Sequence, residues 1–595
     1  MFATSTTNTP TRSIAPDVLA QLLFNDDPYN AHRHWRDLLG SPEFTDGDVP
    51  DRAIRVDRAY TRLRRINEAV SDPLRLARDV RNLAALHEWV GIVDGSLATV
   101  AGIHYNLFLG SIADHTHVPE RDLTDLLDLT RVGTFLCTEL DHGNDASNLE
   151  TTATYRPRTN DFILHTPHPG ARKFMPNTSL AGGPKSAVVA ARLISDGRDL
   201  GVFLFLAPLS DTSGHLPGVS VTALPARTGS PVDHCLTSFD QVCLPRTALL
   251  EDPQTTLLPD GTLKTCAAGK RKRFLTSIGR VTEGKICMTA AAVGVSRSAL
   301  ATAVSYADRR HVGGFARAGV RVPVSALRSH QDRLTHAVAT GYALTFLHRA
   351  VTRAWADKTP EERTGAEVRV AVSKAWVTWR AREILAECRE RCGAQGLLAD
   401  KPLSSYLQDV EGTITAEGDN LAIWVKSASA LIFDTDPAPI SDHSRTPLED
   451  PAALRDALAA QEARLRRRAG AALRSGPARD PLGRWNNTTP AALDLTAAHA
   501  ERLAADAFLS AVNTADAEHQ PTGDILRQLC RLFLLDRLAP RAGDLLAAGI
   551  WTPDTVRGLP ETRERLTDEL GPLLPTLTRA FGVPDSIRDS LPVVR

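Results

Sequence analysis

This 595-residue chain has almost no net charge, because its 69 Lys and Arg residues are balanced by 70 Asp and Glu residues. A balanced chain has no overall field that would attract nucleic acid or an anionic membrane surface. Its length and its 43% hydrophobic content suffice for roughly three or four domains with buried cores. We therefore expect a globular protein whose partners bind at local sites, with no nucleic acid among them.

Targeting signals are missing as well. Residues 1–10 have neither the basic segment nor the apolar core of a signal peptide. No apolar run approaches the roughly 20 residues of a membrane span. Residues 591–595 do not match the peroxisomal Ser-Lys-Leu signal. These absences predict a cytoplasmic protein without a membrane span.

The common metal-binding and nucleotide-binding motifs are also absent. The eight cysteines are scattered, and the close pair Cys388 and Cys392 has helical spacing without the paired Cys-x-x-Cys or the histidines of a zinc site. We predict no metal site. No Gly-x-Gly-x-x-Gly follows a predicted strand, so Rossmann-type cofactor binding is not indicated. No P-loop is present, which argues against a kinase or ATPase.

The sequence does contain a clear change of pattern along the chain. Apolar residues at three- and four-residue spacing predict helices from Ala15 to about Leu129. The glycine-rich apolar run 89–110 predicts a buried helix, in which we expect His104 to be a core histidine. Beyond Arg131, short apolar segments separated by turn residues predict strands. The predicted strands are 133–138, 161–165, 186–194, 200–207, 219–222 and 236–244.

Long amphipathic patterns return at 282–309, 325–355, 364–392 and 421–433, which favours a helical bundle. After a proline-rich linker at 434–440, a further helical region runs from 451 to about 583. The sequence thus predicts an α+β, mainly α, fold with four domains. They are an N-terminal helical domain at 1–130, a central β-domain at 131–270, a four-helix bundle at 271–436 and an extra C-terminal helical domain at 437–595.

Glu417 is the candidate catalytic base. It opens the turn Glu417-Gly418-Asp419-Asn420, directly before the apolar helical pattern at 421–433. The start of a helix offers unpaired N–H groups and positive potential, which can hold a carboxylate in place beside a ligand. Taken alone, a surface turn with Asn420 as the N-cap is the commoner explanation of these four residues.

Several motifs, in a fixed order, resemble the acyl-CoA oxidase family. Thr-Glu-Leu-Asp-His-Gly-Asn at 138–144 and Leu-Glu-Thr-Thr-Ala-Thr-Tyr at 149–155 are similar to the signature of the family's β-domain. Similar segments follow at 162–167, 173–174, 239–246, 306–310 and 417–420. The resemblance covers essentially the whole chain, including the C-terminal helical domain that distinguishes these oxidases from shorter acyl-CoA dehydrogenases. It implies the acyl-CoA dehydrogenase-like fold, with a β-barrel-like central domain.

The resemblance also implies a function in fatty acid β-oxidation. Glu417 matches the family's base, which removes the α-proton of an acyl-CoA while the β-hydrogen leaves as hydride to N5 of FAD. The product is a trans-2-enoyl thioester, and reoxidation of the flavin by O₂ gives H₂O₂. A thioester α-C–H is a weak acid, so such a base needs a raised pKa in a dry pocket.

The resemblance further implies which residues contact the cofactor and the substrate. Arg280 matches an arginine near the thioester ligand. A glycine turn that the partner subunit presents in the family's homodimers matches Gly393, Gln395 and Gly396. The remaining matches to FAD contacts are Phe135, Leu136, Cys137, Thr138, Gly143, Asn144, Asn177, Arg309, Gln331 and Asp419.

The chain departs from the family pattern at Cys137, Asp141, Met175, Asn177 and His311. These departures motivate a second hypothesis, in which the substrate is an acyl or aminoacyl group on a carrier protein of a biosynthetic pathway. A third hypothesis is a non-redox binding or assembly subunit that retains the fold. The electron acceptor also stays open between O₂ and an electron-transfer flavoprotein.

Overall fold

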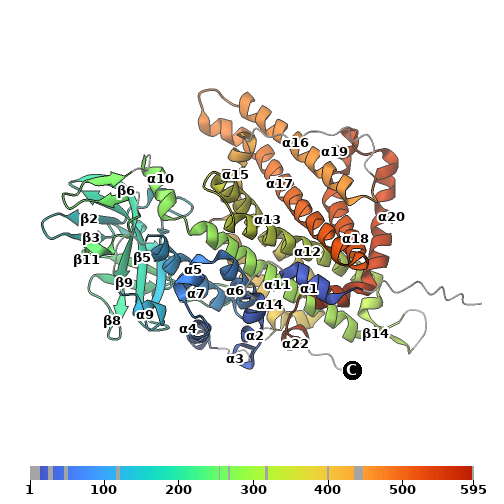
Figure 1. Cartoon of the computed structure of the whole chain (residues 1–595), viewed down its shortest axis with the longest axis horizontal. Helices are drawn as coiled ribbons and strands as arrows, with labels where there is room; N and C mark the ends of the chain where they lie inside the picture. The colour runs from blue at the N-terminus through green and yellow to red at the C-terminus, as the bar shows by residue number, and fades with distance from the viewer. Residues whose placement is uncertain are drawn as a thin grey trace, which may run out of the picture.

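Helices form most of the structure, and the strands gather in one domain at its side, apart from a short pair at 311–313 and 321–323 beside the helical bundle (Figure 1). This computed structural model describes residues 14–24, 31–45, 51–115, 121–252, 255–265, 269–314, 319–398, 401–433 and 447–591. The linker predicted at 434–440 lies outside these residues. The predicted order of helices, then strands, then helices is confirmed.

The N-terminal region is helical, as predicted. The buried helix expected at 89–110 is interrupted after Val93, because the side chain of Asp94 caps a new helix by accepting a hydrogen bond from the N–H of Ser96. A π-helix then spans Gly102–Leu109. His104 is a core histidine, as expected, and its Nδ1 accepts a hydrogen bond from the N–H of Gly133 at 3.0 Å. The helices are α1 (Pro16–Phe24), α2 (Ala31–Leu39), α3 (Pro42–Thr45), α4 (Arg52–Glu68), α5 (Pro73–Arg78), α6 (Val80–Val93), α7 (Gly95–Ala101), α8 (Gly110–Asp114) and α9 (Thr124–Leu127).

Two helical stretches, Gly95–Asp114 and Val281–Arg309, are long and apolar enough to cross a membrane by length and composition alone. The prediction that no run approaches this length was therefore too strong. Their apolar windows are 83% and 94% buried inside the structure. Burial of this extent is what a core helix shows, and it explains the hydropathy of both stretches without a membrane.

The β-domain is built around the long strand β5 (Lys185–Ser195). One edge of β5 pairs antiparallel with β6 (Arg198–Pro208), and the other pairs in parallel with β1 (Val132–Leu136) and then with β2 (Thr152–Arg156). The sheet continues antiparallel from β2 through β3 (Asp161–His165) to β11 (Val242–Pro245). A second sheet has the order β4 (Lys173–Phe174), β10 (Cys235–Phe239), β9 (Val219–Ala223). The short pairs are β7 (Ser210–Asp211) with β8 (Gly214–His215), β12 (Thr255–Leu257) with β13 (Leu263–Thr265), and β14 (His311–Gly313) with β15 (Arg321–Pro323).

The strand predicted at 236–244 is in fact two strands, β10 and β11, that belong to different sheets. The chain turns between them at Gln241, whose φ is +53°. A positive φ ends an extended strand, and the apolar pattern on both sides hid this turn in the sequence.

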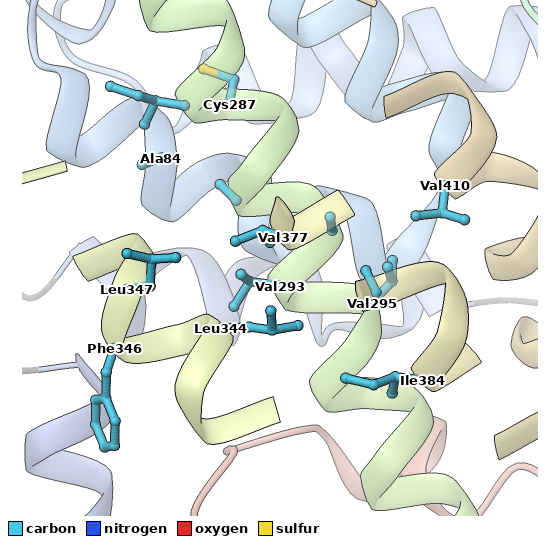
Figure 2. Close-up of a cluster of buried hydrophobic side chains, with 14 of the residues drawn as sticks. Ala84, Cys287, Val293, Val295, Leu344, Phe346, Leu347, Val377, Ile384 and Val410 are labelled. Atoms are coloured by element: carbon cyan, nitrogen blue, oxygen red, sulfur yellow. The ribbon is translucent and has the colours of Figure 1, made fainter. Parts of the chain in front are cut away.

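The helical bundle surrounds α11 (Val281–Arg309), which packs against α6, α12, α13 and α14. In Figure 2, side chains of α11 such as Val293 and Val295 lie among those of the neighbouring helices, including Leu344, Val377 and Val410. Helix α14 had not been predicted. The other helices of this region are α10 (Gly269–Ser277), α12 (Arg328–Ala356), α13 (Arg363–Arg391), α14 (Pro402–Thr415) and α15 (Asn420–Phe433).

A buried ion cluster joins α6, α11 and α12. The carboxylate of Glu88 is fully buried and accepts hydrogen bonds from Arg297 of α11 and Arg349 of α12. Burial alone would raise the pKa of Glu88, but the two guanidinium groups hold it well below its usual value. Gly294 allows the close approach of α6 and α11, since a Cβ there would lie 2.0 Å from the carbonyl oxygen of Glu88.

The C-terminal helices pack on α12 and α13, on the side of the bundle away from the β-domain (Figure 1). Their presence confirms the predicted helical region. They are α16 (Pro451–Ser475), α17 (Pro481–Glu518), α18 (Gln520–Leu538), α19 (Ala542–Ala547), α20 (Pro553–Leu570), α21 (Leu574–Arg579) and α22 (Asp585–Arg588).

Candidate active site

Glu417 lies in the turn between α14 and α15, with its backbone in the left-handed region (φ +60°) and followed by Gly418 at φ +100°. Asp419 caps α15, because its carboxylate accepts hydrogen bonds from two N–H groups of the first helical turn at 3.0 and 3.4 Å. The alternative in which Asn420 is the N-cap was therefore wrong. Asn420 is the first residue of α15 and is buried.

A buried lysine of α13 ties this turn to the bundle. Lys374 donates hydrogen bonds to the carbonyl oxygens of Ile414 and Gly418, at 2.8 and 3.0 Å, and to Oδ1 of Asn420, at 2.9 Å. These three oxygens lie on both sides of Glu417 in the chain. The backbone that carries the Glu417 carboxylate is thus held at both ends by one side chain.

The Glu417 carboxylate points into buried space that Gly284 of α11 leaves free. A Cβ at Gly284 would lie 2.4 Å from Cδ of Glu417. Burial raises the pKa of Glu417 to about 7, with Lys285 and Lys374 acting in the opposite direction and Glu283 adding to the rise. A carboxyl group that loses its proton near neutral pH is suited to general-base catalysis.

The end of β1 and the loop that follows it face the same turn. Oδ1 of Asn144 accepts a hydrogen bond from the N–H of Asp419 at 3.4 Å, which connects the β-domain loop to the turn. Burial raises the pKa of the Cys137 thiol to about 11, and the negative charge of Glu417 contributes to this rise. Leu136 instead packs in the interior of the β-domain. The predicted residues that remain partly or fully exposed here are Phe135, Cys137, Thr138, Gly143 and Asn144.

The polar side chains of two predicted contact residues form hydrogen bonds within the protein. Asn177 is fully buried, and its amide donates to the hydroxyl of Tyr60 at 3.0 Å and accepts from that of Thr134 at 2.5 Å. Arg280 is also buried.

The Arg280 guanidinium donates to the carbonyl oxygens of Asn106, at 3.2 Å, and Ala77. These partners give Asn177 and Arg280 structural roles, and the contacts expected of them with cofactor and substrate stay predictions. A match of single residues in the sequence does not show what their polar atoms bind.

The remaining predicted residues lie at the opposite end of α11. From Gly284 to Arg309 the helix rises by about 37 Å, at roughly 1.5 Å per residue. Arg309 lies near the turn at 393–396, since its charge opposes the rise that burial causes in the pKa of Cys392. Gln331 packs against Gly571 of the C-terminal region. Within one chain, the predicted cofactor contacts therefore form two separate groups.

The chain matches two family models, "Acyl-CoA oxidase, C-alpha1 domain" over residues 279–432 and "Acyl-CoA oxidase" over residues 450–591. The chain belongs to the acyl-CoA oxidase family. It is 29% identical to acyl-coenzyme A oxidase 2, peroxisomal, of Arabidopsis thaliana over 573 residues, which are 88% of this chain and 81% of that protein. It is 30% identical to the human peroxisomal acyl-coenzyme A oxidase 3, over 58% of this chain and 52% of that protein. The match thus spans about half the length of the human relative.

Solved acyl-CoA oxidases have the same fold. Acyl-CoA oxidase 1 of Yarrowia lipolytica superposes with a TM-score of 0.85 at 22% identity, covering 97% of this chain and 90% of that one. Acyl-CoA oxidase-2 of Caenorhabditis elegans, bound with FAD, ascaroside-CoA and ATP, has a TM-score of 0.82 at 20% identity and the same coverage. The acyl-CoA dehydrogenase-like fold is confirmed. Because several relatives are named peroxisomal, the comparisons do not confirm the predicted cytoplasmic localisation.

Sequence reasoning missed three residues of this acyl-CoA oxidase family member that surround Glu417, namely Gly284, Lys285 and Lys374. Lysines in an amphipathic helical pattern are most often solvated, so neither lysine stood out. The only indication in the sequence is that the two lysines fall on inward-facing positions of α11 and α13. That indication points to Glu417 only when the structure shows both helices packed against its turn.

Gly284→Ala tests whether the space beside the carboxylate is required. The added methyl group needs the position of Cδ of Glu417, so we expect the kcat for an acyl-CoA to fall by about tenfold to a hundredfold, as a displacement of about 1 Å can do. Steady-state kinetics on the flavin-loaded protein would measure this. Gly558→Ala in α20 is the control, because nothing lies within 4 Å of a Cβ there. Equal kcat values for the two variants would contradict the assignment.

Proposed function

We propose that this chain is an FAD-dependent acyl-CoA oxidase in which Glu417 removes the α-proton of the acyl group. The observation that carries the proposal is the Glu417 carboxylate, which is directed into a buried gap of α11 and has a raised pKa. The turn that bears it also faces the end of β1, where the family motif predicts the flavin. Family membership and relatives solved with FAD support the cofactor.

The residues present fit FAD in two respects. Beside Gly143 a Cβ would meet nothing within 4 Å, which leaves room for a flat ring system against the backbone. At the other end of α11, Nη2 of Arg309 and Oε1 of Gln395 are buried without a hydrogen-bond partner among the described residues. The Arg309 guanidinium, whose Nη2 also lies 4.0 Å from the Asp589 carboxylate, and the Gln395 amide oxygen suit the pyrophosphate and adenosine parts of a dinucleotide. When bound, FAD supplies the acceptor for the β-hydride and passes the electrons to O₂, which becomes H₂O₂.

The chemistry assigned to the protein is the transfer of the α-proton. Glu417 in its ionised form accepts this proton, and the electrons of the α-C–H bond form the α,β double bond of the trans-2-enoyl thioester. Removal of water from the carboxylate makes it a stronger base, which a weakly acidic α-C–H requires. Lys285 and Lys374 oppose the rise in its pKa, so the ionised form is still populated near neutral pH.

We also propose a homodimer, because the predicted cofactor contacts form two separate groups. Gly284, beside Glu417, and Arg309 lie about 37 Å apart along α11, which exceeds the length of a dinucleotide, so one bound FAD would not reach both groups of the same chain. A twofold axis brings the Arg309 end of one copy to the Glu417 end of the other, because such an interface is reciprocal. We therefore include Arg309 and Gln331, with the 393–396 turn, among the residues that serve the partner's cofactor.

Glu417→Gln is the direct test of the base. We expect the variant to retain yellow flavin but to lose about two to four orders of magnitude in the rate of flavin reduction by an acyl-CoA. In the native protein the ionised carboxylate is the active form, so kcat/KM should rise with pH through the pKa of about 7. Stopped-flow bleaching under anaerobic conditions measures both effects. Near-normal reduction of the flavin in the variant would end this assignment.

Subunit complementation tests the shared cofactor site. In a mixed dimer of Glu417→Gln and Arg309→Ala chains, one of the two sites combines native Glu417 with native Arg309, while the other carries both changes. We expect each homodimer to be inactive and doubly tagged mixed dimers to recover about half of the native activity, as twofold symmetry requires. No recovery in mixed dimers that bind flavin would show that Arg309 serves the site of its own chain.

The substrate and the electron acceptor are tested together. We expect acyl-CoAs of some chain length to bleach the flavin anaerobically and to release H₂O₂ in air without an added acceptor. Bleaching by carrier-bound acyl or aminoacyl groups, with acyl-CoAs inert, would favour the biosynthetic alternative. Bleaching without H₂O₂ would indicate an electron-transfer protein as acceptor. A colourless protein that cannot be reconstituted with FAD would favour the non-redox alternative.

A further inference from the structure

Two lysines face the Glu417 carboxylate, and they differ in what they bind. Among the residues that the structure describes, Lys285 on α11 donates to the carbonyl oxygen of Val281 in its own helix, at 3.3 Å, and to no other group. Lys374, on α13, donates to three oxygens of the segment that carries Glu417. Both contribute a positive charge near the carboxylate, but one of them also holds the chain that bears it.

We propose that Lys374 is the positioning residue of the base: together with Asn420 it forms a latch that fixes the Glu417 turn against α13. The inference rests on the proposed role of Glu417 and adds to it the device that sets the carboxylate's position. Asn420 completes the latch, because its amide donates to Oγ1 of Thr378 at 2.9 Å and to the carbonyl oxygen of Ala375 at 3.3 Å.

The conformation of the turn shows why it needs an external restraint. Glu417 and Gly418 both have positive φ angles. This region is unfavourable for a residue with a side chain, so Glu417 keeps it only where other contacts impose it. The carbonyl oxygen of Ile414 also lies in the last turn of α14, where helix carbonyls have no partner in their own helix and attract a cation. Lys374 satisfies this oxygen and that of Gly418 at once.

The latch requires the charged form of Lys374. Three acceptors lie around Nζ, and only an ammonium group has three N–H bonds to donate. Burial and the positive charge of Lys285 together lower the pKa of Lys374 to about 7, against the opposing charges of Glu417 and Asp419. The observed hydrogen bonds are therefore those of the protonated lysine, which the neighbouring carboxylates maintain.

Further charged groups around Glu417 and the two lysines come from three helices, α11, α13 and α15. Glu283 of α11 contributes to the pKa of Glu417, and Lys426 of α15 and Glu367 of α13 contribute to that of Lys285. A change of one lysine therefore alters the titration of the whole group. The test has to separate this loss of charge from the loss of the latch.

Lys374→Met and Lys285→Met form a matched pair for this purpose. Each variant removes one positive charge beside Glu417, so both should shift the rise of kcat with pH to higher values. Only Lys374→Met removes the three hydrogen bonds. The plateau kcat is taken at the maximum of each pH profile, because Lys374 loses its own proton above a pH of about 7. We expect this kcat in Lys374→Met to be at least about tenfold below that of Lys285→Met, with a larger isotope effect for an α-deuterated acyl-CoA because proton transfer has become slower. Flavin content and KM should change little in either variant.

Thr378→Val is a milder variant that keeps both lysines and their charges. It removes the oxygen to which Asn420 donates, so we expect a severalfold lower plateau kcat with an unchanged pH midpoint. This variant decides the question if Lys374→Met does not fold.

Equal plateau kcat values for the two methionine variants would overturn the latch, since the lysines would then act by charge alone. A native plateau kcat in Thr378→Val, where Lys374→Met cannot be purified, would overturn it as well. Glu417→Gln separates this failure from that of the proposed function. If Glu417→Gln is inactive and the two lysine variants have equal kcat values, the latch is wrong but Glu417 remains the base. If Glu417→Gln is active, the assignment of Glu417 as the base is itself wrong.

Discussion

The buried carboxylate of Glu88 is the interaction on which the arrangement of the central helices depends. It lies on α6 and accepts hydrogen bonds from Arg297 of α11 and Arg349 of α12. The three helices must therefore keep their positions relative to one another for both arginines to reach the carboxylate. Charges buried in this way are costly unless each has its partner. Gly294 adds a steric condition, because only a residue without a side chain lets α6 and α11 approach so closely at this point. Helix α11 can therefore neither slide nor rotate without losing both interactions.

The fixed register of α11 determines the surroundings of Glu417. Gly284 lies about 20 Å along the helix from Arg297, at roughly 1.5 Å per residue, and provides the gap for the carboxylate. Lys285 follows directly, and α13 brings Lys374 to the turn from the other side. The environment of the base is thus set by two long helices, while the turn itself supplies only the glutamate. The same rigid helix places Arg309 at its far end, which is why one chain divides the predicted cofactor contacts into two groups.

How well the sequence predicted this arrangement depends on whether a feature is determined by nearby residues or by residues far away in the chain. Helices α11, α12, α13 and α15 begin and end within about three residues of the predicted bounds, because an amphipathic period repeats many times along them. Helix α14 was missed, although its 14 residues equal the length of α15. The resemblance selected Glu417, which lies in a conformationally constrained turn, as the base. It also assigned cofactor and substrate contacts to Asn177 and Arg280, whose polar atoms have partners within the protein. Which polar atoms those side chains bind depends on residues far away in the chain, and a motif contains no information about them.

In the proposed mechanism, Lys285 and Lys374 resolve a conflict inherent in using a carboxylate as a base for a weak carbon acid. Removing water from Glu417 makes it more basic, but the same desolvation favours its protonated form, which cannot accept a proton. A fully exposed glutamate would stay ionised and be too weak. Lys285 and Lys374 lower the pKa from the value that burial alone would impose, so a basic carboxylate remains ionised near neutral pH. Because Lys374 also bonds the backbone on both sides of Glu417, the group that keeps the base ionised is the same group that holds it in position.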